Sequence, residues 1–167
     1  TLPPAPQVLS HKKQNQIYVE LLIKAHQCFV HECSMEGIVN VLHRAKCLSN
    51  YLAQAKSWSL IVRLLIGIAR YREMFYCFDI LIENEQFESL LGQFEEEKSL
   101  GLRQAILAHL REHYANEKGR SLLKLAALHF VMSKELAEMW EQDAEELVKN
   151  ILNAHQGERF RLPEHLT

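Results

Sequence analysis

The stretch RLLIGIARYREMFYCFDIL, residues 63–81, decides the fold class of this chain. Apolar residues recur every three or four positions on both sides of its centre, which is the spacing of a buried helical face. The centre itself holds Gly67, Arg70, Tyr71 and Arg72. We interpret this polar interruption as the corner where one buried helix ends and the next begins, and not as a reaction centre. Gly67 is expected to allow the close approach of another backbone or to weaken the helix just before it ends, Tyr71 to anchor the corner, and Arg70 or Arg72 to bind carbonyls at the helix end.

The same apolar spacing extends over most of the chain. Proline occurs only at positions 3, 4, 6 and 163, so the residue that most reliably ends a helix is missing between them. No stretch of any length alternates apolar and polar residues as a strand does. The predicted helices run from about Gln14 to Glu32, from Ser34 to Gln54, from Ser57 or Ser59 to Ile68, from Arg72 to Glu83, around Phe87 to Leu91, from Leu102 to Tyr114, and from Leu122 to Ile151 with or without a break near Ser133.

Consecutive amphipathic helices with short joints are typical of antiparallel helix pairs. We therefore predict an all-α fold, built as an α-solenoid or irregular antiparallel helical-hairpin array. A compact helical bundle is the alternative, because the sequence shows no strict repeat of fixed period. Residues 1–12 are predicted to be a flexible N-terminal linker, residues 13–156 a single all-helical domain that is a segment of a larger helical array, and residues 157–167 a flexible C-terminal tail.

The composition favours a globular, cytoplasmic chain. Of the 167 residues, 48% are hydrophobic and 24% are charged. The longest apolar runs are far shorter than the roughly 20 residues that a membrane-spanning helix needs, so no direct membrane insertion is expected. The chain begins at Thr1 without a charged leader, and we interpret it as a piece of a longer protein.

Basic and acidic residues are unevenly distributed along the chain. Residues 1–72 hold nine Lys and Arg against three Asp and Glu, whereas residues 73–167 hold ten against eighteen. This asymmetry suits charge-guided docking to a protein partner, with Arg44, Arg63 and Arg72 as candidate partner-facing residues, or reflects solvated helix faces that differ in charge. A nucleic-acid partner is not expected, because no basic cluster is interleaved with stacking aromatic residues.

The stretch AHQCFVHEC holds four residues of types that bind zinc, namely His26, Cys28, His31 and Cys33. On one helix, His26 and Cys33 share a face, whereas Cys28 and His31 lie nearly opposite. A zinc site would therefore require the helix to unwind or a second segment to supply ligands. We predict no metal and no other cofactor, and keep a zinc-binding protein as the least favoured alternative.

Few residues in the sequence are candidates for catalysis. All four cysteines lie in apolar helical patterns and are predicted to be reduced and buried, and nothing local to Cys47 or Cys77 suggests the base and the lowered pKa that a nucleophile needs. His129 lies on an apolar stripe and is expected to be a hydrogen-bonded core residue. His109 and His113 are expected on an exposed helix face. We predict that the chain is not an enzyme.

The sequence AHQCF, then MEGIVNVLHRAKCL, and above all RLLIGIARYREMFYCFDIL followed by FESLL resemble the C-terminal region of the spatacsin family. The resemblance is clear from about Ala25 to Leu91 and looser from Leu102 to Trp140. Its pattern of Arg-Leu-Leu-x-Gly-Ile-x-Arg-Tyr-x-Glu-Met is met here by Arg63, Leu64, Leu65, Gly67, Ile68, Arg70, Tyr71, Glu73 and Met74. Because these are mostly apolar or corner residues, we assign Arg63, Gly67, Arg70, Tyr71, Glu73 and Met74 to folding and to stacking on the rest of the parent chain.

The resemblance implies a non-enzymatic scaffold. Members of the spatacsin family associate with spastizin and with the fifth adaptor-protein complex at late endosomes and lysosomes, and are linked to lysosome reformation, autophagy and endolysosomal sorting. A spastizin-like protein and adaptor-complex subunits are therefore the expected partners, and the cytoplasmic side of the lysosome and late endosome the expected location. A helical-repeat peptide-binding module unrelated to this family is the alternative. Apolar surface at the ends of a helical array also predicts self-association of the isolated fragment.

Overall fold

The structure is a computed structural model that describes residues 10–92 and 100–160, with side chains described for residues 10–92 and 101–156. Within these ranges it contains helices and no strand, which confirms the all-α prediction. The distinction between a helical array and a compact bundle stays a prediction. The helices are α1 (His11–His31), α2 (Met35–Gln54), α3 (Trp58–Ile68), α4 (Phe75–Glu83), α5 (Phe87–Leu91), α6 (Leu100–His113), α7 (Glu117–His129) and α8 (Ser133–Phe160).

The helices form two compact units, of which unit 1 ends at Ala115 and unit 2 begins at Asn116. The prediction of one helical domain over residues 13–156 stays a prediction. Helix α1 begins at His11, within the predicted linker, and α8 extends to Phe160, within the predicted tail. The other residues of the predicted linker and tail lie outside the described ranges. None of the helices in the described residues combines the length and the hydropathy that crossing a bilayer requires.

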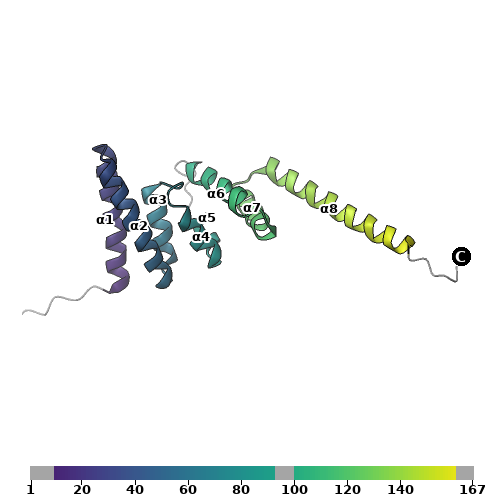
Figure 1. The fold of residues 1–167 in the computed structure, drawn as a ribbon, viewed down its shortest axis with the longest axis horizontal. Coiled ribbons are helices and arrows are strands. Elements are labelled where there is room, and N and C mark those ends of the chain that lie inside the picture. Colours follow the sequence, from purple (N-terminus) through teal and green to yellow (C-terminus); the bar gives the residue numbers. More distant parts are fainter. Residues whose placement is uncertain (1–9, 93–99, 161–167) are drawn as a thin grey trace, which may run out of the picture. The chain divides into compact units, whose positions relative to one another are not determined.

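Unit 1 is built around the hairpin of α1 and α2 and the buried helix α3. Helix α3 contacts α1, α2, α4 and α5, and Figure 1 shows α1 to α4 side by side. The chain turns between α1 and α2 at Cys33, which has a φ of 54°, and Ser34 caps α2 by accepting a hydrogen bond from the Gly37 N–H at 3.2 Å. The core includes Val19, Leu22, Ile23, Val41, Ala45, Leu48, Leu60, Ile61, Leu64, Leu65, Phe78 and Leu81.

Helices α3 and α4 meet at a corner formed by residues 69–74. Helix α3 ends at Ile68, and Ala69 follows in the left-handed region with a φ of 59°. Because left-handed backbone costs an L-residue about 1 kcal/mol or more, the surrounding packing has to hold this conformation. Met74 is fully buried, and its N–H bonds the Arg70 carbonyl at 2.9 Å. Helix α4 starts at Phe75, three residues later than predicted, because residues 71–74 form the turn that precedes it.

Gly67 lies where α3 packs against α1. A Cβ atom at this position would lie 2.3 Å from the Ile23 Cδ1 atom and 2.6 Å from the Ile23 Cγ1 atom. Side chains cannot approach so closely, so only glycine leaves room for Ile23 without rearrangement. The predicted close approach at Gly67 is therefore made by a side chain of α1 and not by another backbone.

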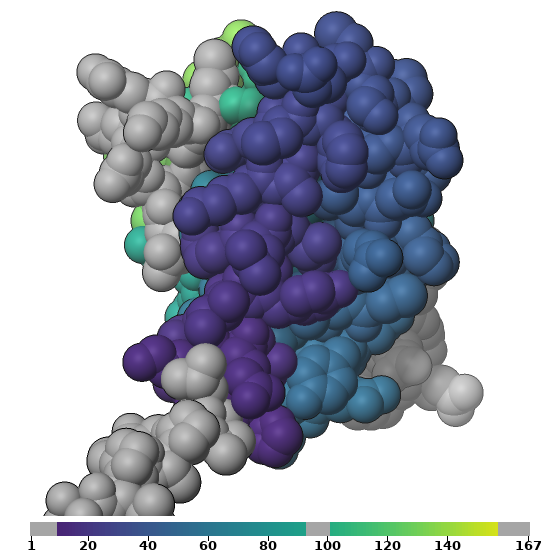
Figure 2. All heavy atoms as spheres, turned by 90° about the vertical axis from the view of Figure 1, so that its left-hand side faces the viewer, coloured from purple at the N-terminus to yellow at the C-terminus, as the bar shows by residue number. Residues whose placement is uncertain are grey.

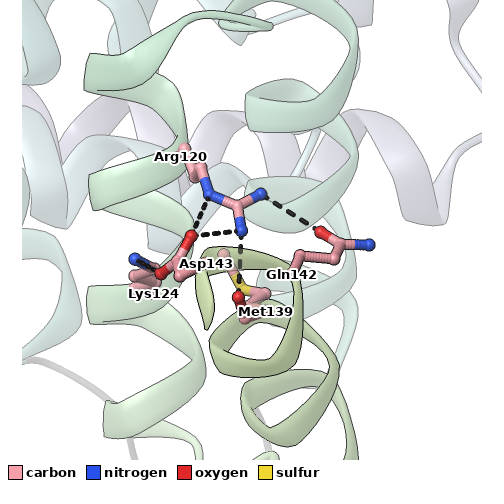
Figure 3. Close-up of polar contacts among 5 residues, drawn as sticks. All are labelled: Arg120, Lys124, Met139, Gln142 and Asp143. Carbon is pink, nitrogen blue, oxygen red and sulfur yellow. Dashed lines mark hydrogen bonds and ion pairs between the residues drawn. The ribbon is translucent and has the colours of Figure 1, made fainter. Parts of the chain in front are cut away.

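Unit 2 is the hairpin of α7 and α8, which are separated by a break just before Ser133. Figure 3 shows the polar contacts that join the two helices. The Arg120 Nη2 atom donates to the Asp143 Oδ1 atom at 2.6 Å and to the Met139 carbonyl at 3.0 Å, and Arg120 Nε also donates to Asp143 at 3.1 Å. Lys124 pairs with the other Asp143 oxygen. These bonds from Lys124 and Arg120 lower the pKa of Asp143.

Candidate functional site

Arg63 and Glu20 join α3 to α1. The Arg63 Nε and Nη2 atoms donate to the two carboxylate oxygens of Glu20 at 2.7 and 3.1 Å. This bidentate geometry is the stronger form of the ion pair and lowers the pKa of Glu20. Arg63 is thus bound within the chain, and its assignments as a partner-facing residue and as a folding residue both stay predictions.

Arg70 connects the corner to the middle of α1. Its Nε atom donates to the His26 Nε2 atom at 3.1 Å, and its Nη1 atom lies 3.7 Å from the Glu73 carboxylate. Burial of His26, together with the Arg70 charge, lowers the pKa of the ring. A neutral His26 accepts at Nε2 and so carries its proton on Nδ1. Arg70 therefore binds this histidine, and no bond from it to the carbonyls at the end of α3 is seen.

The candidate zinc ligands do not converge. His26 is buried against Arg70, whereas Cys28, His31 and Cys33 are exposed. In the part of the chain that the structure describes, no three His, Cys, Asp or Glu side chains are placed to hold a metal ion. The α1 helix stays intact to His31, so its geometry keeps His26 on a different face from Cys28 and His31, and Cys33 lies in the turn after the helix.

The prediction that all four cysteines are buried is wrong for three of them. Only Cys77 is buried, and burial raises its pKa to about 12, so its thiol is a poor nucleophile. Cys28, Cys33 and Cys47 are exposed. The apolar pattern did not separate them from the core because cysteine is common both in the core and at its edge.

Residues of the corner, α4 and α6 line a pocket, here called the corner pocket. Its volume is about 340 Å³. Phe75 is 49% exposed, and the half-buried Tyr71 ring lies 6.4 Å from the Phe78 ring. The pocket is lined by Tyr71, Arg72, Phe75, Phe78, Gln104, Ala105, Ala108, His109, Glu112 and His113. Aromatic rings, an arginine and two histidines thus surround one concavity.

A partly buried polar cluster supports the wall of the corner pocket. The His109 Nε2 atom lies 2.7 Å from the Asp79 Oδ1 atom, and the Tyr114 hydroxyl donates to the same oxygen at 2.8 Å. Burial, together with the bond to Asp79, raises the pKa of Tyr114 above its usual range. This cluster fixes α6 against α4, and the His109 ring packs 5.3 Å from the Phe78 ring.

Two predictions about histidines are wrong. His109 was expected on an exposed face, but it is only 6% exposed because Asp79 supplies a partner for its ring nitrogen. His129 was expected in the core, but it is exposed at the end of α7. Sequence spacing within one helix does not reveal a polar partner that is 30 residues away. Asp79 inside an otherwise apolar helix was the available signal, since a partly buried carboxylate is stabilised by a donor.

The three candidate partner-facing arginines have different surroundings. Arg63 pairs with Glu20, Arg72 lines the corner pocket, and Arg44 lines the surface between α1 and α2. Of the other residues assigned to the motif, Met74 is buried under the corner, Gly67 receives Ile23, and Glu73 lies near Arg70. The corner pocket takes in only Tyr71 from the motif together with the neighbouring Arg72.

Comparison with known proteins gives a family and two relatives. The family model described as the spatacsin C-terminus matches residues 6–165. The chain is 39% identical to mouse spatacsin over 126 residues, which are 75% of this chain and 5% of spatacsin. It is 35% identical to a protein of Dictyostelium discoideum over 135 residues, which are 80% of this chain and 4% of that protein. No solved structure matches.

Proposed function

Because this chain belongs to the spatacsin C-terminal family, we propose that it is a non-enzymatic scaffold segment that binds protein partners. The family membership also excludes the alternative of a helical module unrelated to spatacsin. The chain spans about 5% of the length of mouse spatacsin, so the activity of the whole protein enters here only as a proposal. The proposed partners are a spastizin-like protein and subunits of the fifth adaptor-protein complex, in lysosome reformation, autophagy and endolysosomal sorting at the surface of lysosomes and late endosomes.

The observation that carries this proposal is the composition of the corner pocket. Tyr71, Arg72 and Phe75 lie around one concavity, and Phe75 is half exposed. Aromatic residues and arginine supply most of the binding energy at protein interfaces, especially where a pocket shields them from water. The ion pair of Asp79 and His109 holds the wall in place before a partner arrives, which limits the entropy lost on binding.

The same residues define the chemistry of the partner segment. The Tyr71 and Phe75 rings offer apolar contact to an aliphatic or aromatic side chain. Arg72 at the pocket favours a neighbouring carboxylate, whereas His113 lies 3.8 Å from Glu112, which also lines the pocket. We therefore expect an apolar side chain flanked by Asp or Glu to enter the corner pocket.

The test is capture of spastizin and adaptor-complex subunits from cytosol by the purified chain. Phe75→Ala removes an exposed ring and Arg72→Glu reverses the charge, and each is expected to weaken binding at least about tenfold, or about 1.4 kcal/mol. Arg111→Glu on α6 is the matched control, because it makes the same charge change outside the pocket lining and should leave binding unchanged.

Two outcomes would contradict the proposal in different ways. If the unmodified chain captures neither spastizin nor adaptor subunits, the assignment of partners is wrong. If it captures them and both pocket variants bind equally well while keeping their helical circular dichroism, the partners use another surface. In that case weaker binding by the variant Tyr51→Ala would identify the surface between α1 and α2 as the binding surface. Tyr51 is an aromatic residue on that surface and is about as exposed as Phe75.

A further inference from the structure

A second apolar surface lies on the side of α1 and α2 that faces away from α3. Two hollows of about 490 and 350 Å³ share Tyr18 and Arg44 and together form what we call the outer groove. Figure 2 faces this side of unit 1, with α1 in purple beside α2 in blue. The groove is lined by Asn15, Tyr18, Leu21, Leu22, Ala25, Phe29, Asn40, Val41, His43, Arg44, Cys47, Leu48 and Tyr51. No lining residue is acidic, and Leu21 is 57% exposed.

Helix α8 carries an apolar face that α7 does not cover. Residues Leu136 and Met139 are buried, but Trp140, Leu147 and Ile151 are 54, 61 and 48% exposed. The exposed residues that follow one another at intervals of four and three, here called the α8 stripe, are Ala137, Trp140, Ala144, Leu147, Ile151 and Ala154. This spacing is the seam pattern of a helix that packs along another helix.

The two surfaces match in length. Along α1, the outer groove runs from Asn15 to Phe29, which is about 21 Å at 1.5 Å per residue. The large residues of the α8 stripe run from Trp140 to Ile151, or about 17 Å. A straight helix that places the stripe in the groove therefore fits within its length.

The charges of the two surfaces are complementary. Helices α1 and α2 together contain five Lys and Arg and two Asp and Glu, and Arg44 lies in both hollows of the outer groove. Helix α8 contains three Lys and Arg and seven Asp and Glu. Glu141 and Glu145 lie next to the stripe residues in the sequence. Two α8 stripes facing each other would bring like charges together, whereas the outer groove places Arg44 near these glutamates.

We propose that the α8 stripe of one copy binds in the outer groove of a second copy. The contact is head to tail, because each chain uses its groove on one neighbour and its stripe on another. Such an interface leaves a free groove and a free stripe in every dimer, so the assembly grows with concentration unless it closes into a ring. This assigns two specific surfaces to the self-association that the sequence predicts, and it does not involve the corner pocket.

The test is the mass of the purified full chain by sedimentation velocity over a hundredfold range of concentration. We expect the average mass to rise with concentration. Leu21→Asp in the groove and Leu147→Asp in the stripe each place a charge in the contact, and each variant alone should remain a monomer. Val131→Asp is the matched control, since this residue is 77% exposed and belongs to neither surface, and it should assemble like the unmodified chain.

Mixing the two variants separates this proposal from other modes of assembly. One intact stripe and one intact groove remain in the mixture, so an equimolar mixture should form a dimer that grows no further. A dimer formed by the groove variant alone would overturn the proposal in favour of stripe-to-stripe pairing. A monomeric unmodified chain at every concentration, or a mixture that stays monomeric, would also overturn it, whatever the result for the corner pocket.

Discussion

His26 shows how one residue in this fold responds to pH. The ring is buried and accepts a hydrogen bond from Arg70, and both effects favour its neutral form. The pKa of His26 is therefore lower in the folded chain than the ordinary value of 6.5, which applies after unfolding. Above pH 6.5 both states are neutral and the full stability is present. As the pH falls below this value, the unfolded chain binds the proton more readily, so the free energy of unfolding decreases.

Urea unfolding at about pH 7.5 and about pH 5 measures this effect, and NMR titration of the ring measures the pKa itself. The variant His26→Gln keeps an acceptor for Arg70 but cannot titrate, so its stability should fall less over the same range. A His26 ring that titrates at or above pH 6.5 in the folded chain would contradict the prediction.

The role of a residue could be predicted where its contacts lie close to it in the sequence, and not where they lie far away. Met74 and Gly67 were both assigned to folding: Met74 is buried at the corner, and Gly67 lies before the corner in α3, against Ile23. The partner of Arg70 could not be predicted, because His26 lies 44 residues away and resembled a metal ligand in its own sequence context. Asp79 and His109 were missed for the same reason, since their contact forms only after α4 and α6 pack.

The packing of α1 on α3 depends on the missing side chain at Gly67. Gly67→Ala would place a Cβ atom 2.3 Å from Ile23 Cδ1, and Ile23 is only 2% exposed and cannot move into solvent. Overpacking of this kind costs about 1–3 kcal/mol, whereas alanine gains about 1 kcal/mol over glycine in a helix. We therefore expect a net decrease of about 1 kcal/mol in the free energy of unfolding, measured by urea denaturation.

Gly101 in α6 provides the matched control for this substitution. Its added Cβ atom would meet only the Tyr71 ring, at 3.7 Å, which is an ordinary contact. Gly101→Ala should therefore leave stability unchanged or raise it by up to about 0.5 kcal/mol. The double variant Ile23→Ala with Gly67→Ala should lose less free energy of unfolding than the two single variants lose in sum. Additive effects would show that Ile23 is not the obstacle.

At the level of whole elements, the apolar period predicted the helices well and their ends less well. Helix α2 and the short α5 match the predicted ranges, and the break before Ser133 is one of the two alternatives left open. The start of α4 was placed too early, at Arg72 instead of Phe75. Residues 70–74 include apolar and helix-favouring residues, so the sequence continues the pattern although the backbone has turned.

The fold class of the molecule was predictable because it depends on a pattern repeated in every helix, whereas its sites depend on which helices meet. The corner pocket combines residues 71–78 with residues 104–113, and no spacing within either segment indicates the other. The division at Ala115 was also not predicted. Asn116 caps α7 through a bond to the Gly119 N–H at 2.8 Å, but such a cap marks the start of a helix and not a boundary between units.

The division into two units predicts that residues 10–115 fold without the rest of the chain. Unit 1 contains α1 to α6 and the core around α3, so its buried contacts close within this range. The fragment should show helical circular dichroism and unfold in one cooperative urea transition.

The shorter fragment 10–92 is the control. It lacks α6, which supplies Ile106, Leu110 and the His109 bond to Asp79, so it should unfold at a lower urea concentration. A fragment 10–115 without a cooperative transition, or one no more stable than 10–92, would show that unit 1 is not an independent folding unit.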